Sequence, residues 1–171
     1  LNVVPQDDDV FLADTFYMQP GAYDEALAGV YGNFSLTGTT GAESSFLGGI
    51  DAGTSNYGRC LLYLQTLSAD EMIWSYENDP GTKEIQRSIW TSSNPLFLGM
   101  YSRAMVEVAL VNEFLKQSTP EKLSSRGVSA SDVTKRELYR KEVRVLRALA
   151  YYHLMDLFGK ATFVTENDPV N

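Results

Sequence analysis

The chain has 171 residues, a formal net charge of −8 and a single cysteine. A hydrophobic content of 44% with 12% aromatic residues is enough to form a packed core, which excludes a disordered chain. One cysteine excludes an intrachain disulfide and a cysteine-based metal cluster. No apolar run reaches the roughly 18 residues that a membrane-spanning helix needs.

The charge is distributed unevenly along the chain. Residues 1 to 80 contain one cation, Arg59, against twelve carboxylates, whereas the remaining residues carry thirteen cations against ten carboxylates. An acidic surface repels a phosphate backbone, and the basic residues of the second half are mixed with acidic ones. The charge pattern therefore argues against a nucleic-acid partner.

The first predicted element is a helix from Ala22 to Leu36, entered through Pro20-Gly21 and marked by apolar residues at spacings of three and four. The following stretch, Thr37 to Gly58, contains six glycines and has neither a helical nor a strand period. We expect a long loop there. Long loops in compact domains often contact ligands or partners, and a loop that only covers the core is the alternative.

The region after this loop is predicted to contain a β-hairpin. Tyr57 to Asp79 is rich in apolar residues and is compatible with a strand or a short helix. Asp79-Pro80-Gly81 has the composition of a turn, because proline presets φ and glycine accepts a positive φ. Ile85 to Trp90 alternates apolar and polar residues, which is typical of a strand.

Two long helices are predicted in the second half. One of about 20 residues starts near Pro95, a residue that suits the first helical turn. A polar connection, residues 118–131, leads to a helix over residues 132–158, with Ser129 and Ser131 as candidate N-caps and Gly159 as its C-terminal stop. Two amphipathic helices joined by a short link predict an antiparallel helical hairpin.

Catalytic and metal-binding motifs are scarce. The single histidine, His153, lies on the apolar stripe of the last helix and is interpreted as a core residue, as is Cys60. From one histidine and one cysteine, neither a Ser-His-Asp triad nor a histidine-based zinc site can be assembled convincingly. Gly48 to Gly53 lacks the flanking elements of a phosphate loop, and Asp7 to Asp9 is interpreted as a solvated charge run. Carboxylate-only chemistry stays open, and no cofactor or metal is expected.

One segment indicates a family. Residues 139–166 read YRKEVRVLRALAYYHLMDLFGKATFVTE and resemble a pattern of SusD/RagB-type nutrient-binding lipoproteins. The matching positions are Glu142, Arg144, Leu146, Arg147, Ala148, Tyr151, Tyr152, Leu154, Phe158, Gly159 and the strand-like Phe163-Val164-Thr165-Glu166. Leu1 to Asp7 and Asn112 to Leu115 agree with two further family segments. Ala161-Thr162 departs from the Val-Pro that is usual in the family.

The resemblance implies a mainly α fold of tetratricopeptide-like antiparallel helices with long loops, a SusD-like α superhelix in which residues 1–171 form the N-terminal part of one domain. It implies a non-enzymatic cell-surface subunit that captures an oligosaccharide or other nutrient and delivers it to a SusC-like TonB-dependent outer-membrane transporter. Its other implied partner is the remaining C-terminal part of the same protein. It also implies outer-membrane attachment only through a lipid anchor upstream of Leu1.

Carbohydrate binding requires aromatic faces for the apolar side of a sugar ring and polar groups for its hydroxyls. Residues around the predicted turn supply both: Trp74, Tyr76, Asn78, Asp79, Arg87 and Trp90. Asp70-Glu71 occupies the place of a family dipeptide that precedes a ligand-binding loop in starch-binding relatives, although the following residues do not match that pattern closely. The alternatives are that Trp74 and Trp90 only pack, and that the chain is a helical-repeat adaptor for a protein partner.

Overall fold

The computed structural model describes residues 13–37 and 53–168. Over these ranges the chain is mainly helical and contains no β-strand. Its elements are α1 (Ala13–Phe16), α2 (Ala22–Gly32), α3 (Tyr57–Leu62), the π-helix η1 (Tyr63–Leu67), α4 (Thr82–Gln86), α5 (Pro95–Gln117), α6 (Pro120–Ser125) and α7 (Ala130–Phe158). Most of the predicted loop 37–58, and Asp7 to Asp9, lie outside the described residues.

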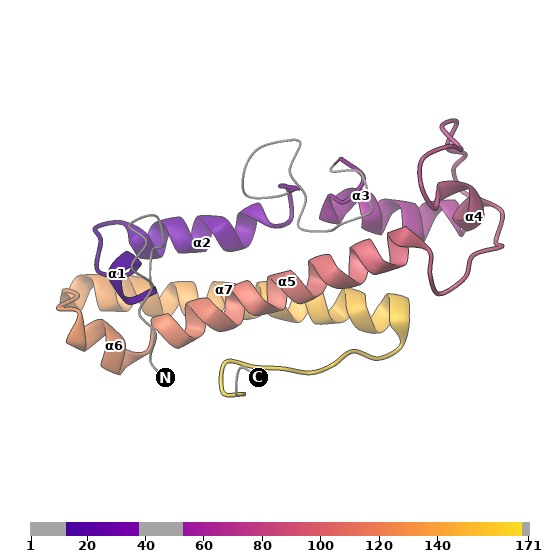
Figure 1. The fold of residues 1–171 in the computed structure, drawn as a ribbon. Coiled ribbons are helices and arrows are strands. Elements are labelled where there is room, and N and C mark those ends of the chain that lie inside the picture. Colours follow the sequence, from indigo (N-terminus) through magenta and orange to yellow (C-terminus); the bar gives the residue numbers. More distant parts are fainter. Residues whose placement is uncertain (1–12, 38–52, 169–171) are drawn as a thin grey trace, which may run out of the picture.

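The scaffold is an antiparallel pair formed by the two longest helices, α5 and α7 (Figure 1). Helices α2 and α3 follow one another along this pair, with α1 and α6 near one end of the molecule and α4 near the other. The predictions of a mainly α fold and of a helical hairpin are therefore confirmed. None of the helices in the described ranges combines the length and the apolar character needed to cross a bilayer.

The ends of the two long helices follow the sequence signals. Asn94 caps α5 by accepting a hydrogen bond from the Leu96 N–H at 2.9 Å, and Pro95 occupies the first turn. Ser129 caps α7 by accepting from the Asp132 N–H at 3.2 Å, so that α7 starts two residues before the predicted position. At its other end, Gly159 has φ 72°, the left-handed conformation that glycine adopts readily.

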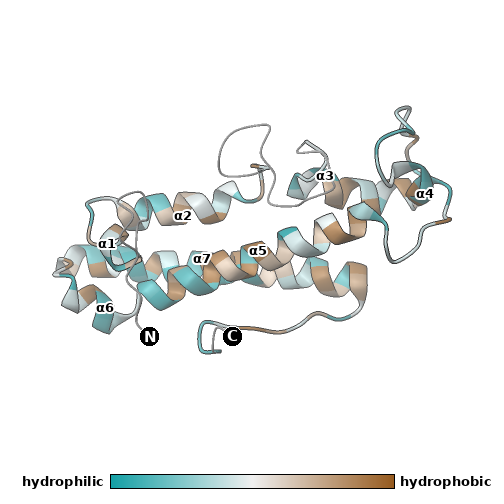
Figure 2. Ribbon diagram, viewed as in Figure 1, coloured by the Kyte–Doolittle hydropathy of each residue, from teal (hydrophilic) through white to brown (hydrophobic). Residues whose placement is uncertain are grey.

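Hydrophobic residues, brown in Figure 2, recur along α5 and α7 between hydrophilic ones. They form two buried clusters. One joins α3, η1 and α4 to the start of α5 and the end of α7, with Tyr63, Leu67 and Leu154 among its members. The other joins α1, α2 and α6 to the end of α5 and the start of α7, around Tyr23 and Phe114. Each cluster therefore packs against one half of the α5–α7 pair.

The predicted β-hairpin is wrong. Thr82 to Gln86 form α4, and Gly81, with φ 84°, precedes this helix instead of closing a hairpin turn. The reason is burial: Thr82 and Ile85, which are three residues apart, both point into the core, whereas Ile89 and Trp90 are exposed. Tyr57 to Leu67, which the sequence left undecided, is helical.

The predicted strand at Phe163 to Glu166 is also wrong. The segment has no strand partner among the described residues, and side chains of α5 and α7 hold it instead. The Tyr151 hydroxyl donates to the Val164 carbonyl and accepts from the Val164 N–H, both at 2.8 Å. Burial raises the pKa of Glu166, but the hydrogen bond from Arg147, a backbone hydrogen bond and the charges of Arg147 and Arg144 together outweigh it and hold that pKa below its usual range. The family-like positions Arg147, Tyr151 and Glu166 therefore anchor this segment.

The face of α7 opposite α5 carries apolar side chains that are exposed. Leu149 and Tyr152 are two of them. They belong to a line of exposed apolar residues that we call the outer stripe: Leu138, Val145, Leu149, Tyr152 and Met155. Val143, Ala150 and Leu154 form the buried face.

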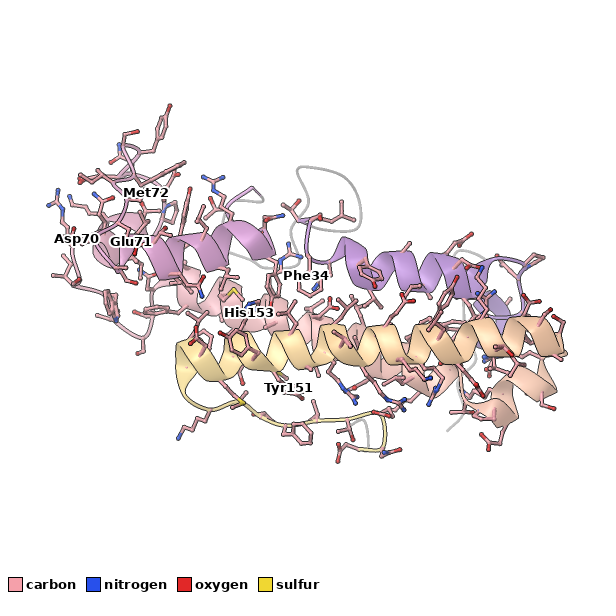
Figure 3. The ribbon with its side chains drawn as sticks, turned by 180° about the vertical axis from the view of Figure 1, so that it is seen from behind. Phe34, Asp70, Glu71, Met72, Tyr151 and His153 are labelled. Atoms are coloured by element: carbon pink, nitrogen blue, oxygen red, sulfur yellow. The ribbon has the colours of Figure 1, made fainter. Side chains whose placement is uncertain are left out.

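The single histidine and cysteine are structural in their surroundings. His153 is half-buried, and its Nδ1 lies 2.8 Å from the Tyr57 hydroxyl, which joins α7 to α3. Figure 3 places His153 between α7 and the region of Phe34. The ring centroid of Phe34 lies 4.7 Å from that of Tyr57. Cys60 is fully buried, as predicted, and burial raises the pKa of its thiol to about 11. An exposed, reactive thiolate is therefore not formed here.

A buried polar node lies where α2 ends and α3 begins. The fully buried Arg103 of α5 donates from Nε to the Ser55 carbonyl at 2.7 Å and from Nη2 to the Thr37 carbonyl. It also lies 3.5 Å from the Asn33 side-chain oxygen. Arg103 therefore links α5 to both ends of the segment that connects α2 with α3.

Glu107, one turn further along α5, completes this node. Its Oε2 accepts from the Asn33 amide at 2.9 Å, while its Oε1 is buried without a hydrogen-bond partner among the described residues. Burial raises the pKa of Glu107 to about 7, and the Asn33 hydrogen bond offsets only part of this effect. The carboxyl group is thus protonated more readily in the folded chain than in the unfolded one.

We expect this proton to make stability depend on pH. From its usual pKa near 4.5 up to about 7, the folded state binds more protons than the unfolded state, so the free energy of unfolding falls as pH rises. At about 1.4 kcal/mol per pKa unit, the loss is about 3 kcal/mol. Glu107→Gln should remove this pH-dependent loss of stability. Urea unfolding at pH 5 and pH 8 measures both proteins, and an equal pH dependence in the two would contradict this assignment.

Candidate functional site

The candidate site lies at the α4 end of the molecule, in the segment between η1 and α4. Figure 3 shows Asp70, Glu71 and Met72 at this end, where the chain leaves the helical scaffold. The residues that follow, 72–76, have no regular secondary structure apart from a bend. Their neighbour α4 is a helix and offers no strand with which they could form a β-ladder. Side-chain contacts fix their conformation instead.

Three aromatic rings form a row from the core to the surface. Tyr63 of η1 is buried, and its ring centroid lies 5.1 Å from that of the half-buried Trp74. Trp74 in turn lies 5.7 Å from Tyr76, whose side chain is 68% exposed. Ring pairs at these separations attract one another beyond their area of burial. The row therefore supports an exposed aromatic ring on a rigid base.

Arg59 of α3 clamps the middle of this row. Its guanidinium carbon lies 5.2 Å from the Tyr63 ring centroid and 5.5 Å from that of Trp74, which is the geometry of a cation–π contact. Its Nε donates to the Tyr63 hydroxyl at 2.7 Å, and its Nη2 donates to Asp79 at 3.3 Å. The same Asp79 oxygen accepts from the Trp74 indole at 3.0 Å. The Trp74 ring, the Arg59 guanidinium and the Asp79 carboxylate therefore hold one another in place.

Two further contacts attach the segment to α4. The Trp74 backbone N–H donates to the Gln86 side-chain oxygen at 2.6 Å. The Arg87 guanidinium donates to both oxygens of Glu77 at 2.9 Å, and both side chains of this ion pair are substantially exposed. Both contacts come from the single Nη2 nitrogen of Arg87, and an exposed ion pair of this kind adds little stability.

The structure brings together only some of the predicted site residues. Trp74, Tyr76 and Asp79 are neighbours, and Asn78 is exposed beside them. Arg87 is paired with Glu77. Trp90 does not join the row: its ring contacts Phe97 of α5. Asp79 accepts hydrogen bonds from Trp74 and Arg59. In this geometry its carboxylate supports the indole.

Arg59 and Tyr63 were missed by the sequence analysis. A partial signal was present, because Arg59 is the single cation among the first 80 residues and an isolated cation in an acidic region needs a carboxylate partner. Which carboxylate it binds depends on how the chain turns between α3 and α4. Tyr63 carried no signal that distinguished it from the other apolar residues of this region.

The arrangement suits an uncharged, hydroxyl-rich ligand. Tyr76 presents an aromatic face, and Asn78 adds an amide that can donate and accept hydrogen bonds. Nothing in the described part of the chain groups three or more side chains suited to holding a metal ion. The geometry is therefore that of a surface for stacking and hydrogen bonding.

This chain combines a helical scaffold with the segment that Arg147, Tyr151 and Glu166 anchor. It is similar to the starch-binding protein SusD of Bacteroides thetaiotaomicron, with 29% identity over 147 residues. The match covers 84% of this chain and 25% of SusD, so that the chain spans about a quarter of the length of that relative. No protein-family model matches the chain.

We expect Asp79→Ala to loosen the aromatic row without unfolding the chain. The change removes the acceptor of both Trp74 and Arg59, each of which is partly solvated, so the free energy of unfolding should fall by only about 1 kcal/mol. The near-ultraviolet circular dichroism of the immobilised indole should weaken. Glu77→Ala, which breaks an exposed ion pair, is the matched control and should leave that signal unchanged. Equal spectra for the two variants would show that Asp79 does not orient Trp74.

Proposed function

We propose that the chain is part of a glycan-binding protein and that the Trp74–Tyr76 row contacts the ligand. The observation that carries this proposal is the exposed Tyr76 ring on an immobilised aromatic base. Aromatic faces cover the apolar face of a sugar ring, and a ring that is already fixed loses little conformational entropy on binding. The similarity to a starch-binding protein supports the same ligand class.

The proposed mechanism is capture without bond breaking. A glycan strand stacks on Tyr76 and the accessible edge of Trp74, while Asn78 binds hydroxyl groups. In the full protein, which we propose to be lipid-anchored upstream of Leu1 at the outer-membrane surface, the bound glycan passes to a SusC-like TonB-dependent transporter. The C-terminal part of the protein completes the fold. The resemblance of residues 139–166 to SusD/RagB-type lipoproteins supports these partners and this location.

Calorimetry on the full protein tests the site. A panel of soluble starch, xylan, arabinogalactan and mannan is titrated against the wild type and Tyr76→Ala. Loss of one stacked ring, worth about 1.4 kcal/mol, should weaken binding about tenfold. Tyr152→Ala is a matched control, because Tyr152 is also a well-exposed tyrosine, at 61%, but lies on α7.

Two results would contradict the proposal. Wild-type protein that binds no glycan of the panel would refute glycan capture. Glycan binding that Tyr152→Ala weakens as much as Tyr76→Ala would refute the location of the site.

A helical adaptor for a protein partner is the second candidate function. The observation in its favour is the outer stripe of α7, since exposed apolar residues in line mark interaction surfaces. Val145→Glu places a charge in this stripe and should weaken binding to the transporter at least tenfold in pull-down assays if the adaptor function holds. Under the glycan-capture function, Trp74→Ala with Tyr76→Ala abolishes glycan binding and leaves transporter association intact.

A further inference from the structure

A pocket of about 240 Å³ lies beside Trp90, apart from the Trp74–Tyr76 row. Its apolar lining includes Leu64 of η1 and Ile85 of α4, both of which belong to the hydrophobic core. Phe97 of α5 and Asp156 of α7 contribute to its walls. Four packed elements therefore form the pocket, and its shape depends on the scaffold rather than on a single loop.

Trp90 provides an aromatic wall of fixed orientation. Its ring meets Phe97 edge to face, with centroids 6.1 Å apart and an interplanar angle of 87°. The side chain is nevertheless 42% exposed, although it borders the core. A tryptophan that only packs would gain more by burying this surface. The ring is thus held in place while much of it stays accessible.

Two polar groups of the pocket are available for a ligand, whereas the third, the Ser68 hydroxyl, donates to the Leu64 carbonyl. Within the described residues, neither the exposed Asp156 carboxylate nor the Trp90 indole nitrogen has a hydrogen-bond partner in the chain. The Asp156 carboxylate accepts hydrogen bonds, and the Trp90 indole N–H donates one. A sugar hydroxyl can do both, and a sugar ring also has an apolar face for the indole. A fixed aromatic wall beside such a pair suits a saccharide unit.

We propose that this pocket is a second saccharide subsite, which binds another unit of the glycan held at the Trp74–Tyr76 row. This proposal rests on the proposed function. Residues 74–90 carry both aromatic surfaces, and two contacts, Trp74 to Gln86 and Arg87 to Glu77, connect the halves of this segment. The separation of the two subsites is thereby fixed. A glycan long enough to reach both gains affinity from its second attachment, whereas a disaccharide occupies one subsite at a time.

The two tryptophans of the chain allow each subsite to be observed separately. Trp74→Phe leaves Trp90 as the only indole, and Trp90→Phe leaves Trp74, while each change keeps an aromatic ring in place. Acrylamide quenching of fluorescence is measured for both variants of the 171-residue chain with soluble starch, xylan, arabinogalactan and mannan. A polysaccharide that protects Trp74 should also protect Trp90.

Asp156→Ala provides the second readout, because this exposed side chain makes no hydrogen bond within the described residues; its charge acts on the nearby His153 imidazole. The substitution should weaken polysaccharide binding about fivefold, as expected for a single hydrogen-bonding group, and leave binding of the matching disaccharide at the Trp74–Tyr76 row nearly unchanged. Protection of Trp74 without protection of Trp90, together with unchanged polysaccharide affinity in Asp156→Ala, would overturn the second subsite alone. Protection of neither tryptophan by any polysaccharide would overturn the proposed function and the subsite together.

Discussion

The buried guanidinium of Arg103 is the interaction on which the rest of the structure depends. It binds the Thr37 and Ser55 carbonyls, and these residues flank the segment that joins α2 to α3. Burying a charge is costly unless its donors are satisfied, and the planar guanidinium reaches several acceptors that one lysine could not. By fixing Ser55, Arg103 fixes the start of α3 two residues later. The two halves of the scaffold are thereby held in one register along α5.

This register determines the candidate site. Helix α3 carries Arg59, and η1, which continues it, carries Tyr63; together they receive Trp74. An exposed aromatic ring is useful for binding only if it does not collapse onto the surface when no ligand is bound. Here Trp74 is held by the Arg59 guanidinium over its ring, by the Asp79 carboxylate at its indole nitrogen and by the Gln86 side chain at its backbone N–H. Tyr76 is consequently supported on a base that belongs to the core.

The sequence predicted the long helices well, since their apolar spacing, Ser129 cap and Gly159 stop are local signals. The hairpin failed because Pro80-Gly81 precedes a helix as readily as it forms a turn, and the alternation from Ile85 to Trp90 covers too few residues to determine a period. The sequence singled out the aromatic and polar residues of the candidate site by their chemistry, but it could not supply their geometry. The contact of Arg59 with Asp79 and the separation of Trp90 from Trp74 depend on tertiary packing, which leaves no periodic trace.

The central claim is that a glycan contacts the aromatic row that Arg59 and Asp79 hold in place. Nuclear magnetic resonance tests this most directly, because the chain has two tryptophans and therefore two indole N–H signals, which Trp74→Phe assigns. On titration with an oligosaccharide of the glycan that the protein binds, the account predicts that the Trp74 indole and the Tyr76 amide shift, in proportion to the fraction bound. Saturation with that oligosaccharide while both of these signals stay in place would contradict it.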